Sequence, residues 1–110
     1  MSSNAYQEGN VLTLIAPRAL ASGEGVLVGS IFGVAQHVAA NAAEVETEVV
    51  GVFELPKLST DVVTQGALLY WDNTNFRLTV TASGNTKVGV AVAAAGDGVT
   101  TVLCRLSAAF

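Results

Sequence analysis

The chain has 110 residues and a mass of 11.2 kDa, which suits one compact domain. Hydrophobic residues make up 51% of it and charged residues 13%, which excludes a disordered chain because disorder needs low hydrophobicity and high charge. The net charge of −4 and five scattered basic residues argue against nucleic-acid binding, which depends on clustered Lys and Arg. The lone cysteine, Cys104, excludes an intrachain disulfide and a multi-thiolate metal site.

Membrane insertion is not expected. The longest stretch without a polar side chain, residues 88–96, is about half of what a spanning helix needs. The N-terminal residues lack the basic leader of an export signal. The sequence therefore predicts a soluble single-domain protein made in the cytoplasm.

Seventeen valines and ten threonines favour β-strands, because β-branched side chains lose freedom in helices and pack well on a pleated surface. Alternation of apolar and polar residues is clearest in 44–49, 76–81 and 101–106. Glu44, Glu46 and Glu48 are expected on one face of their strand. In chain order, strands are predicted at 10–16, 25–29, 32–38, 44–49, 51–55, 67–72, 76–81, 86–94 and 101–106.

Turn residues separate these strands, and residues 70–76 are predicted to form a hairpin around the sequence Asp-Asn-Thr-Asn. No segment shows a sustained helical period, although residues 59–65 and the alanine clusters at 39–43 and 93–95 could each form a helical turn. We therefore predict an all-β fold, a small β-barrel or sandwich of short strands with at most one or two short helical turns.

A short internal similarity suggests a fold built from two related parts. Gly33-Val34-Ala35 and Gly89-Val90-Ala91 each follow an apolar strand and lead through an alanine-containing connection to another strand. This pattern predicts two related β units that close one core.

Candidate catalytic and metal-binding residues are few. His37 is the only histidine and has no neighbours at metal-ligand spacing, while Cys104 shares a strand face with apolar residues and is expected to be buried and inert. Glu44, Glu46 and Glu48 could hold a divalent cation, but a solvated strand face is the simpler interpretation. We predict no enzyme, no cofactor and no catalytic residue, because no nucleophile, base and oxyanion site can be assembled.

Tyr70 and Trp71 are the candidate interface anchors of the hairpin. Adjacent residues of a strand point to opposite faces, so one of the two rings is expected inside and the other outside.

Ordered motifs of strand and turn residues run along nearly the whole chain, at 7–14, 21–29, 32–35, 51–57, 65–66 with 69–72, 82–86 with 89–91, and 102–106. Together these motifs resemble the capsid cement, or head decoration, proteins of tailed bacteriophages. One departure is Ala43-Glu44, where many relatives have Gly-Glu, so the turn there is expected to differ.

The resemblance implies a structural protein that binds the exterior of the mature phage head and stabilises it. It implies the major capsid protein as partner and a homotrimer at three-fold or quasi-three-fold positions, with no nucleic acid and no membrane. Faces of small Ala and Val side chains are expected to form the seam between subunits. The resemblance also implies synthesis in the bacterial host cytoplasm and a final location on the outer surface of the virion capsid. The family offers no catalytic residues to carry over.

Residues 1–10 are predicted to form an N-terminal arm that contacts the shell or a neighbouring subunit, and residues 11–110 a single β-rich decoration domain. The alternative function is a small ligand- or glycan-binding β-module that uses the Tyr70 and Trp71 hairpin as a stacking platform. The predicted shell or subunit contacts are Ser3, Asn4, Tyr6, Gln7, Tyr70 and Trp71.

Overall fold

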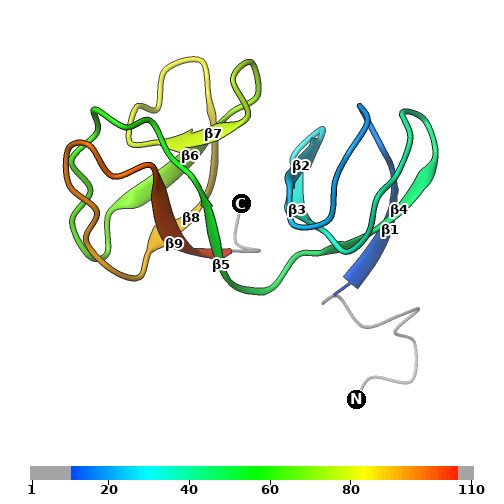
Figure 1. The fold of residues 1–110 in the computed structure, drawn as a ribbon, viewed down its shortest axis with the longest axis horizontal. Coiled ribbons are helices and arrows are strands. Elements are labelled where there is room, and N and C mark those ends of the chain that lie inside the picture. Colours follow the sequence, from blue (N-terminus) through cyan, green and yellow to red (C-terminus); the bar gives the residue numbers. More distant parts are fainter. Residues whose placement is uncertain (1–10, 107–110) are drawn as a thin grey trace.

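The computed structural model describes residues 11–106. This part of the chain forms nine strands in two antiparallel sheets that stand side by side (Figure 1). It contains no helix, and hence none long and apolar enough to cross a membrane. The strands are β1 (Val11–Ile15), β2 (Gly25–Val28), β3 (Ile31–Ala35), β4 (Glu44–Glu48), β5 (Gly51–Pro56), β6 (Leu68–Asp72), β7 (Arg77–Thr79), β8 (Thr86–Ala91) and β9 (Thr101–Leu106).

The first sheet, in strand order β1-β4-β3-β2, belongs to what we call the first unit, residues 11–48. Its register confirms the predicted alternation: Val45 and Thr47 of β4 are fully buried, whereas the three glutamates that alternate with them point outward. Each glutamate lies opposite a residue of the edge strand β1, as in the pair Thr13 and Glu46. One face of this sheet is therefore a core face, and the other is acidic in its β1–β4 half.

The second sheet, in strand order β5-β9-β8-β6-β7, belongs to the second unit, residues 51–106. It curls until its two edges meet. Leu78 of β7 forms a parallel bridge with Lys57, the residue directly after β5, and the carbonyl of Leu78 accepts the N–H of Leu58 at 2.9 Å. A β-bulge between Leu69 and Tyr70 assists the curvature, since bulges bend and twist a strand.

The two units repeat the same topology. β1, β2, β3 and β4 occupy the sheet positions of β5, β6, β8 and β9, and only β7 has no counterpart. Loop hydrogen bonds repeat as well, because Leu20 exchanges two backbone hydrogen bonds with Ala39, and Val63 does so with Ala95. The prediction of two related β units is thereby confirmed.

The difference between the units is the segment that carries β7. Leu20 and Val63 are 43 positions apart, but Ala39 and Ala95 are 56 apart. The additional 13 residues lie between β6 and β8, where the first unit has only the tight turn between β2 and β3. The insertion supplies the strand that closes the second sheet, and the first sheet stays open.

The prediction of one shared core is wrong, because the buried side chains form two clusters. The smaller cluster fills the first unit around Val26 and Val45. The larger cluster fills the second unit and also takes in Phe32 and Val34 of the first. Each curled sheet thus has its own interior, and one strand of the first unit contributes to the neighbouring interior.

The expected helical turns do not form in residues 59–65, because other groups use the backbone and capping atoms. The buried Lys57 ammonium donates to the carbonyls of Leu58, Ser59 and Asp61, at 2.9, 3.4 and 2.7 Å. The Asp61 carboxylate accepts the Thr79 hydroxyl at 2.6 Å and so ties this turn to β7. The ammonium takes carbonyls that a helix would need.

The alanine clusters do not form helical turns either. The backbone N–H and C=O of Ala39 are both hydrogen-bonded to Leu20, and those of Ala95 to Val63. Both alanine side chains are buried. A turn follows Ala40, whose carbonyl accepts the N–H of Ala43 at 3.0 Å, and Ala42 within it adopts a positive φ of 71°. Small side chains at these positions let the loops close over the two cores.

Candidate interaction surfaces

Trp71 of the second unit packs against Phe32 of the first, and we call this contact between the two units the seam. The Trp71 side chain is 1% exposed, and its ring lies 4.9 Å from that of Phe32, centroid to centroid, at an angle of 49°. Gly25 lies against the same indole: a Cβ added there would be 2.6 Å from Trp71. Trp71 is therefore the inward member of the predicted aromatic pair, and its ring has no face open to a ligand.

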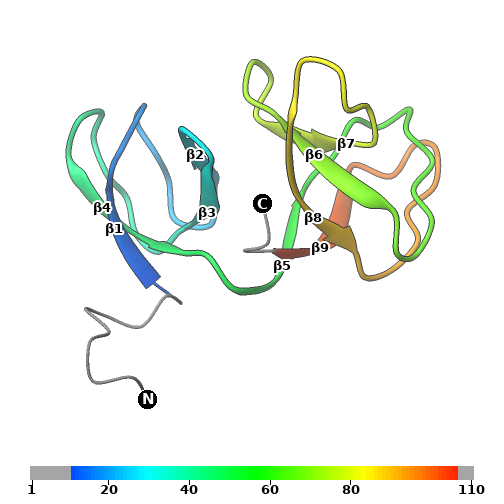
Figure 2. The same cartoon turned by 180° about the vertical axis from the view of Figure 1, so that it is seen from behind.

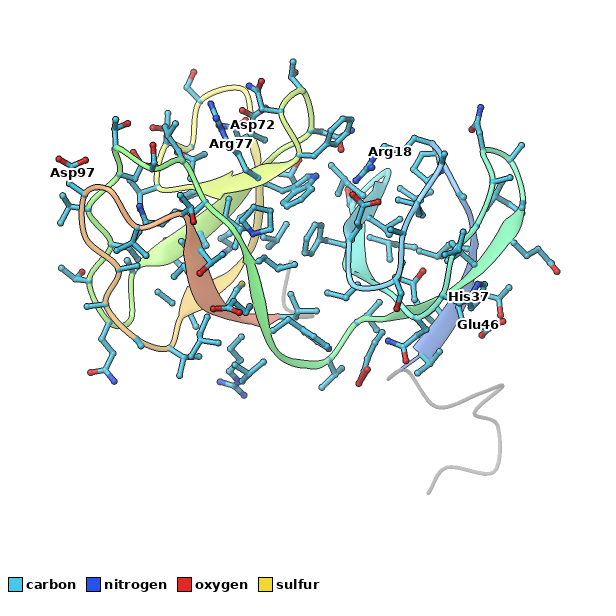
Figure 3. The ribbon with its side chains drawn as sticks, in the orientation of Figure 1. Arg18, His37, Glu46, Asp72, Arg77 and Asp97 are labelled. Carbon is cyan, nitrogen blue, oxygen red and sulfur yellow. The ribbon has the colours of Figure 1, made fainter. Side chains whose placement is uncertain are left out.

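Arg18 makes a second contact between the two units. Its guanidinium donates to the carbonyl of Gly25 at 3.0 Å and forms a 3.6 Å ion pair with Glu24. The same group lies over the ring of Phe76 in the β6–β7 hairpin, 3.9 Å from the centroid, which is a cation–π contact. Figure 3 shows Arg18 on the side of the first unit that faces the second. Sequence reasoning missed this contact because the two residues are 58 positions apart.

The hairpin predicted at residues 70–76 is confirmed, with Asp72 paired to Arg77 across it. The Asp72 carboxylate accepts the N–H of Thr74 at 2.9 Å, the N–H of Asn75 at 3.2 Å and the amide of Asn75 at 2.8 Å. The Asn75 side-chain hydrogen bond, followed by that of the Thr74 backbone, holds the pKa of Asp72 below its usual value of 3.8. The turn is therefore set by one side chain.

Tyr70 is the outward member of the aromatic pair. It is half-buried and lies opposite Lys87 on the outer face of the second sheet. Of the two hairpin residues predicted to make contacts, Tyr70 alone reaches this outer surface. The other predicted contacts, Ser3, Asn4, Tyr6 and Gln7, lie outside the described residues, as does the arm 1–10 that contains them.

An apolar strip crosses the outer face of the second unit. Val52, Arg105, Val90 and Leu68 lie opposite one another in consecutive strands of the sheet, from β5 through β9 and β8 to β6. Leu103 lies on the same face two residues before Arg105. Val52, Leu68 and Leu103 are 51%, 48% and 41% exposed, so nothing in residues 11–106 covers them. We call these five residues the outer strip.

The outer face of the first unit is negatively charged in its β1–β4 half, whereas the outer strip carries the positive charge of Arg105. Glu44, Glu46 and Glu48 form a row there, and Glu46 accepts the Thr13 hydroxyl at 3.0 Å while Glu48 accepts the Gln36 amide at 3.2 Å. The N–H of Glu46 reaches the Nε2 atom of the exposed His37 at 3.2 Å (Figure 3). Among residues 11–106 no group of three or more His, Cys, Asp and Glu side chains is placed to hold a metal ion.

Cys104 is buried in the second core, as its strand position predicts. Burial raises the pKa of its thiol from 9.0 to about 11, and a backbone hydrogen bond from Val90 acts in the opposite direction. A thiol with this pKa is protonated at neutral pH, so it is a poor nucleophile.

The raised pKa of Cys104 predicts a loss of stability at high pH. The neutral buried thiol contributes fully below the unfolded pKa of 9.0, and its contribution disappears as the pH rises through about 11. We expect the difference in unfolding free energy between the wild type and Cys104→Ala to be constant from pH 7 to 8.5 and to shrink from pH 9 to 11. Urea titrations across this range measure it, and a difference that stays constant to pH 11 would contradict the burial of the thiol.

Comparison with known proteins adds a family. A family model described as phage cement protein matches residues 6–106. No curated protein and no solved structure matches the chain. The matched range covers every strand of both units, including the inserted β7. The chain therefore belongs to the phage cement protein family.

Proposed function

We propose that this protein binds the exterior of the mature phage head and stabilises the shell as a homotrimer at three-fold or quasi-three-fold positions. Membership of the phage cement protein family, over residues 6–106, carries the proposal and indicates a capsid cement role on the virion. The proposed partner is the major capsid protein. Synthesis in the bacterial host cytoplasm and a non-enzymatic role belong to the same proposal.

The physical mechanism is differential binding. A clamp that contacts neighbouring shell subunits in their mature arrangement binds that arrangement more tightly than the immature one, and the difference in affinity stabilises the mature state. Three copies acting together turn weak contacts into durable attachment, because the second and third contacts form at high effective concentration. The acidic charge of the chain suits an outer position, since the packaged DNA lies inside.

The chemistry of the described residues supports a binding role. The one free thiol is buried and protonated, and the one histidine spends its Nε2 atom on a backbone N–H. The alternative of a ligand-binding platform at the hairpin has less support, because Trp71 is packed against Phe32. Tyr70 stays a proposed shell or subunit contact, as do the arm residues named above.

The test is co-sedimentation of the purified protein with expanded and unexpanded heads of the matching phage. We expect saturable binding to expanded heads and at least about tenfold weaker binding to unexpanded ones, because the contacts depend on the mature lattice. Deletion of residues 2–9 is expected to weaken binding to expanded heads. Equal binding to both kinds of head would contradict the mechanism, and full-strength binding by the deletion variant would contradict the role of the arm.

A further inference from the structure

We propose that the outer strip of the second unit is a contact between copies of this chain, and that its occupant is the acidic β1–β4 face of the first unit of a neighbouring copy. The inference deepens the proposed function, since it names the surfaces through which the trimer would form.

The outer strip is a continuous surface. Val52, Val90 and Leu68 stand in line on neighbouring strands with the Arg105 side chain among them, and Leu103 extends the line along β9. Single exposed apolar residues are ordinary on a protein surface, but a contiguous row across four strands marks an interaction site. An arginine within an apolar surface is also typical of protein–protein interfaces.

The first unit shows what becomes of the equivalent face inside the chain. Val34 occupies the place of Val90 in the repeated Gly-Val-Ala sequence. Together with Phe32 and Leu27 on its face, Val34 is packed into the core of the second unit and is only 4% exposed. The outer face of the first unit is therefore covered by the second unit in its β2–β3 half, whereas the equivalent face of the second unit is left open.

The partner of the open face must differ from the partner inside the chain. Leu68 stands where the first unit has Gly25, and Gly25 touches the Trp71 ring so closely that a Cβ would be 2.6 Å from it. A leucine at this position cannot accept a tryptophan packed in the same way. The strip requires a surface with apolar residues and a carboxylate for Arg105.

A second copy carries such a surface. Residues 11–48 contain four acidic side chains and one basic one, whereas residues 51–106 contain four of each. On the β1–β4 face, the exposed Glu44 lies directly opposite Ile15, which is 55% exposed. This face alternates apolar residues with carboxylates, and the strip alternates apolar residues with a guanidinium. Within residues 11–106 the Arg105 guanidinium makes no hydrogen bond or ion pair.

Contact between two different faces is heterologous, so each copy offers one face and receives the other. Such head-to-tail contacts close into a ring when the rotation between copies permits it. A closed ring of three copies agrees with the trimer of the proposed function and leaves no strip uncovered.

The experiment compares self-association of the full chain with that of variants, by sedimentation equilibrium in solution and by cross-linking on expanded heads. Arg105→Glu and Leu68→Glu are each expected to weaken association at least about tenfold, because either places a carboxylate against the glutamate row. Val62→Glu is the matched control, since Val62 is 65% exposed and lies in the loop between β5 and β6. Thermal unfolding checks that each variant folds.

Charge reversal identifies the occupant. The combination of Arg105→Glu with Glu44→Arg and Glu46→Arg is expected to recover association, because the opposite charges again face each other. Wild-type association by Arg105→Glu, failure of the combined variant to recover, or a wild type that is monomeric both in solution and on heads would overturn the inference. If the outer-strip variants lose head binding but associate with one another as the wild type does, the inference is overturned and the proposed function is retained. If the wild type associates through this face but binds no heads, the inference is retained and the proposed function is overturned.

Discussion

Replacing Trp71 with alanine is expected to lower the unfolding free energy by about 3–5 kcal/mol, the range measured for deletion of buried aromatic rings. The side chain is 1% exposed, donates its indole N–H to Asn73 at 3.0 Å and fills the space between Phe32 and Gly25. Its removal leaves a cavity in the second core and also removes the ring contact with Phe32 between the two units. Urea unfolding monitored by circular dichroism measures the effect.

Tyr70→Ala is the matched control for this prediction. Tyr70 is the adjacent aromatic residue on the same strand but lies half-buried on the outer face, so its loss is expected to cost about 1 kcal/mol or less. A double-mutant cycle between Trp71 and Phe32 is expected to give a coupling of about 0.5–1.5 kcal/mol, as ring pairs do. Equal effects of the Trp71 and Tyr70 substitutions would contradict the assignment of Trp71 to the seam. At the seam, β2 and β3 of the first unit face the second unit (Figure 2).

Gly89→Ala is expected to destabilise the protein by about 3 kcal/mol or more, because overpacking at the centre of a sheet forces backbone movement. A Cβ at this position would collide with the carbonyl oxygen of Arg105 and lie 2.8 Å from the Cys104 sulfur. Neither the β9 backbone nor a fully buried thiol can move freely. For a domain of this size the expected loss corresponds to a fall of at least about 12 °C in Tm.

Gly96→Ala is the control for Gly89→Ala, since a Cβ added at Gly96 would have no heavy atom within 4 Å and the residue has no positive φ. It is expected to leave Tm within about 3 °C of the wild type. Gly33 holds the equivalent place in the first unit, where a Cβ would be 2.6 Å from the Glu48 carbonyl, and Gly33→Ala should resemble Gly89→Ala. A Gly89→Ala variant as stable as Gly96→Ala would contradict the β8–β9 packing.

Strand positions could be predicted well because local rules set them. Alternation in 44–49 and 101–106 placed Val45, Thr47 and Cys104 inside, and all three are fully buried. The hairpin could be predicted because Asp72 closes its own turn. The repeated Gly-Val-Ala sequence indicated two units because the glycine is required at the same close strand contact in each.

Features that depend on long-range packing could not be predicted. The burial of Phe32 on the outer face of its strand follows from the second unit lying against it, and alternation within one strand contains no such information. The bridge between Lys57 and Leu78, which closes the second sheet, joins residues 21 positions apart. The contact of Arg18 with Phe76 likewise depends on how the two units meet.

The outer strip was hidden from sequence reasoning for a related reason. Its members come from four strands, and only the register places Leu68, Val90, Arg105 and Val52 in one line. The expectation that faces of small apolar side chains form the seam between subunits stays a prediction, and the outer strip itself consists of two valines, two leucines and an arginine. The alanines, however, lie partly in loop closures, as Ala39 and Ala95 do.

The cement function is tested by the temperature at which expanded phage heads lose their integrity, measured by scanning calorimetry with and without saturating protein. Binding that favours the mature lattice must raise this temperature, because a ligand of one state stabilises that state. We predict an increase for expanded heads and none for unexpanded ones. Saturated expanded heads that fail at the same temperature as bare ones would contradict a cement function.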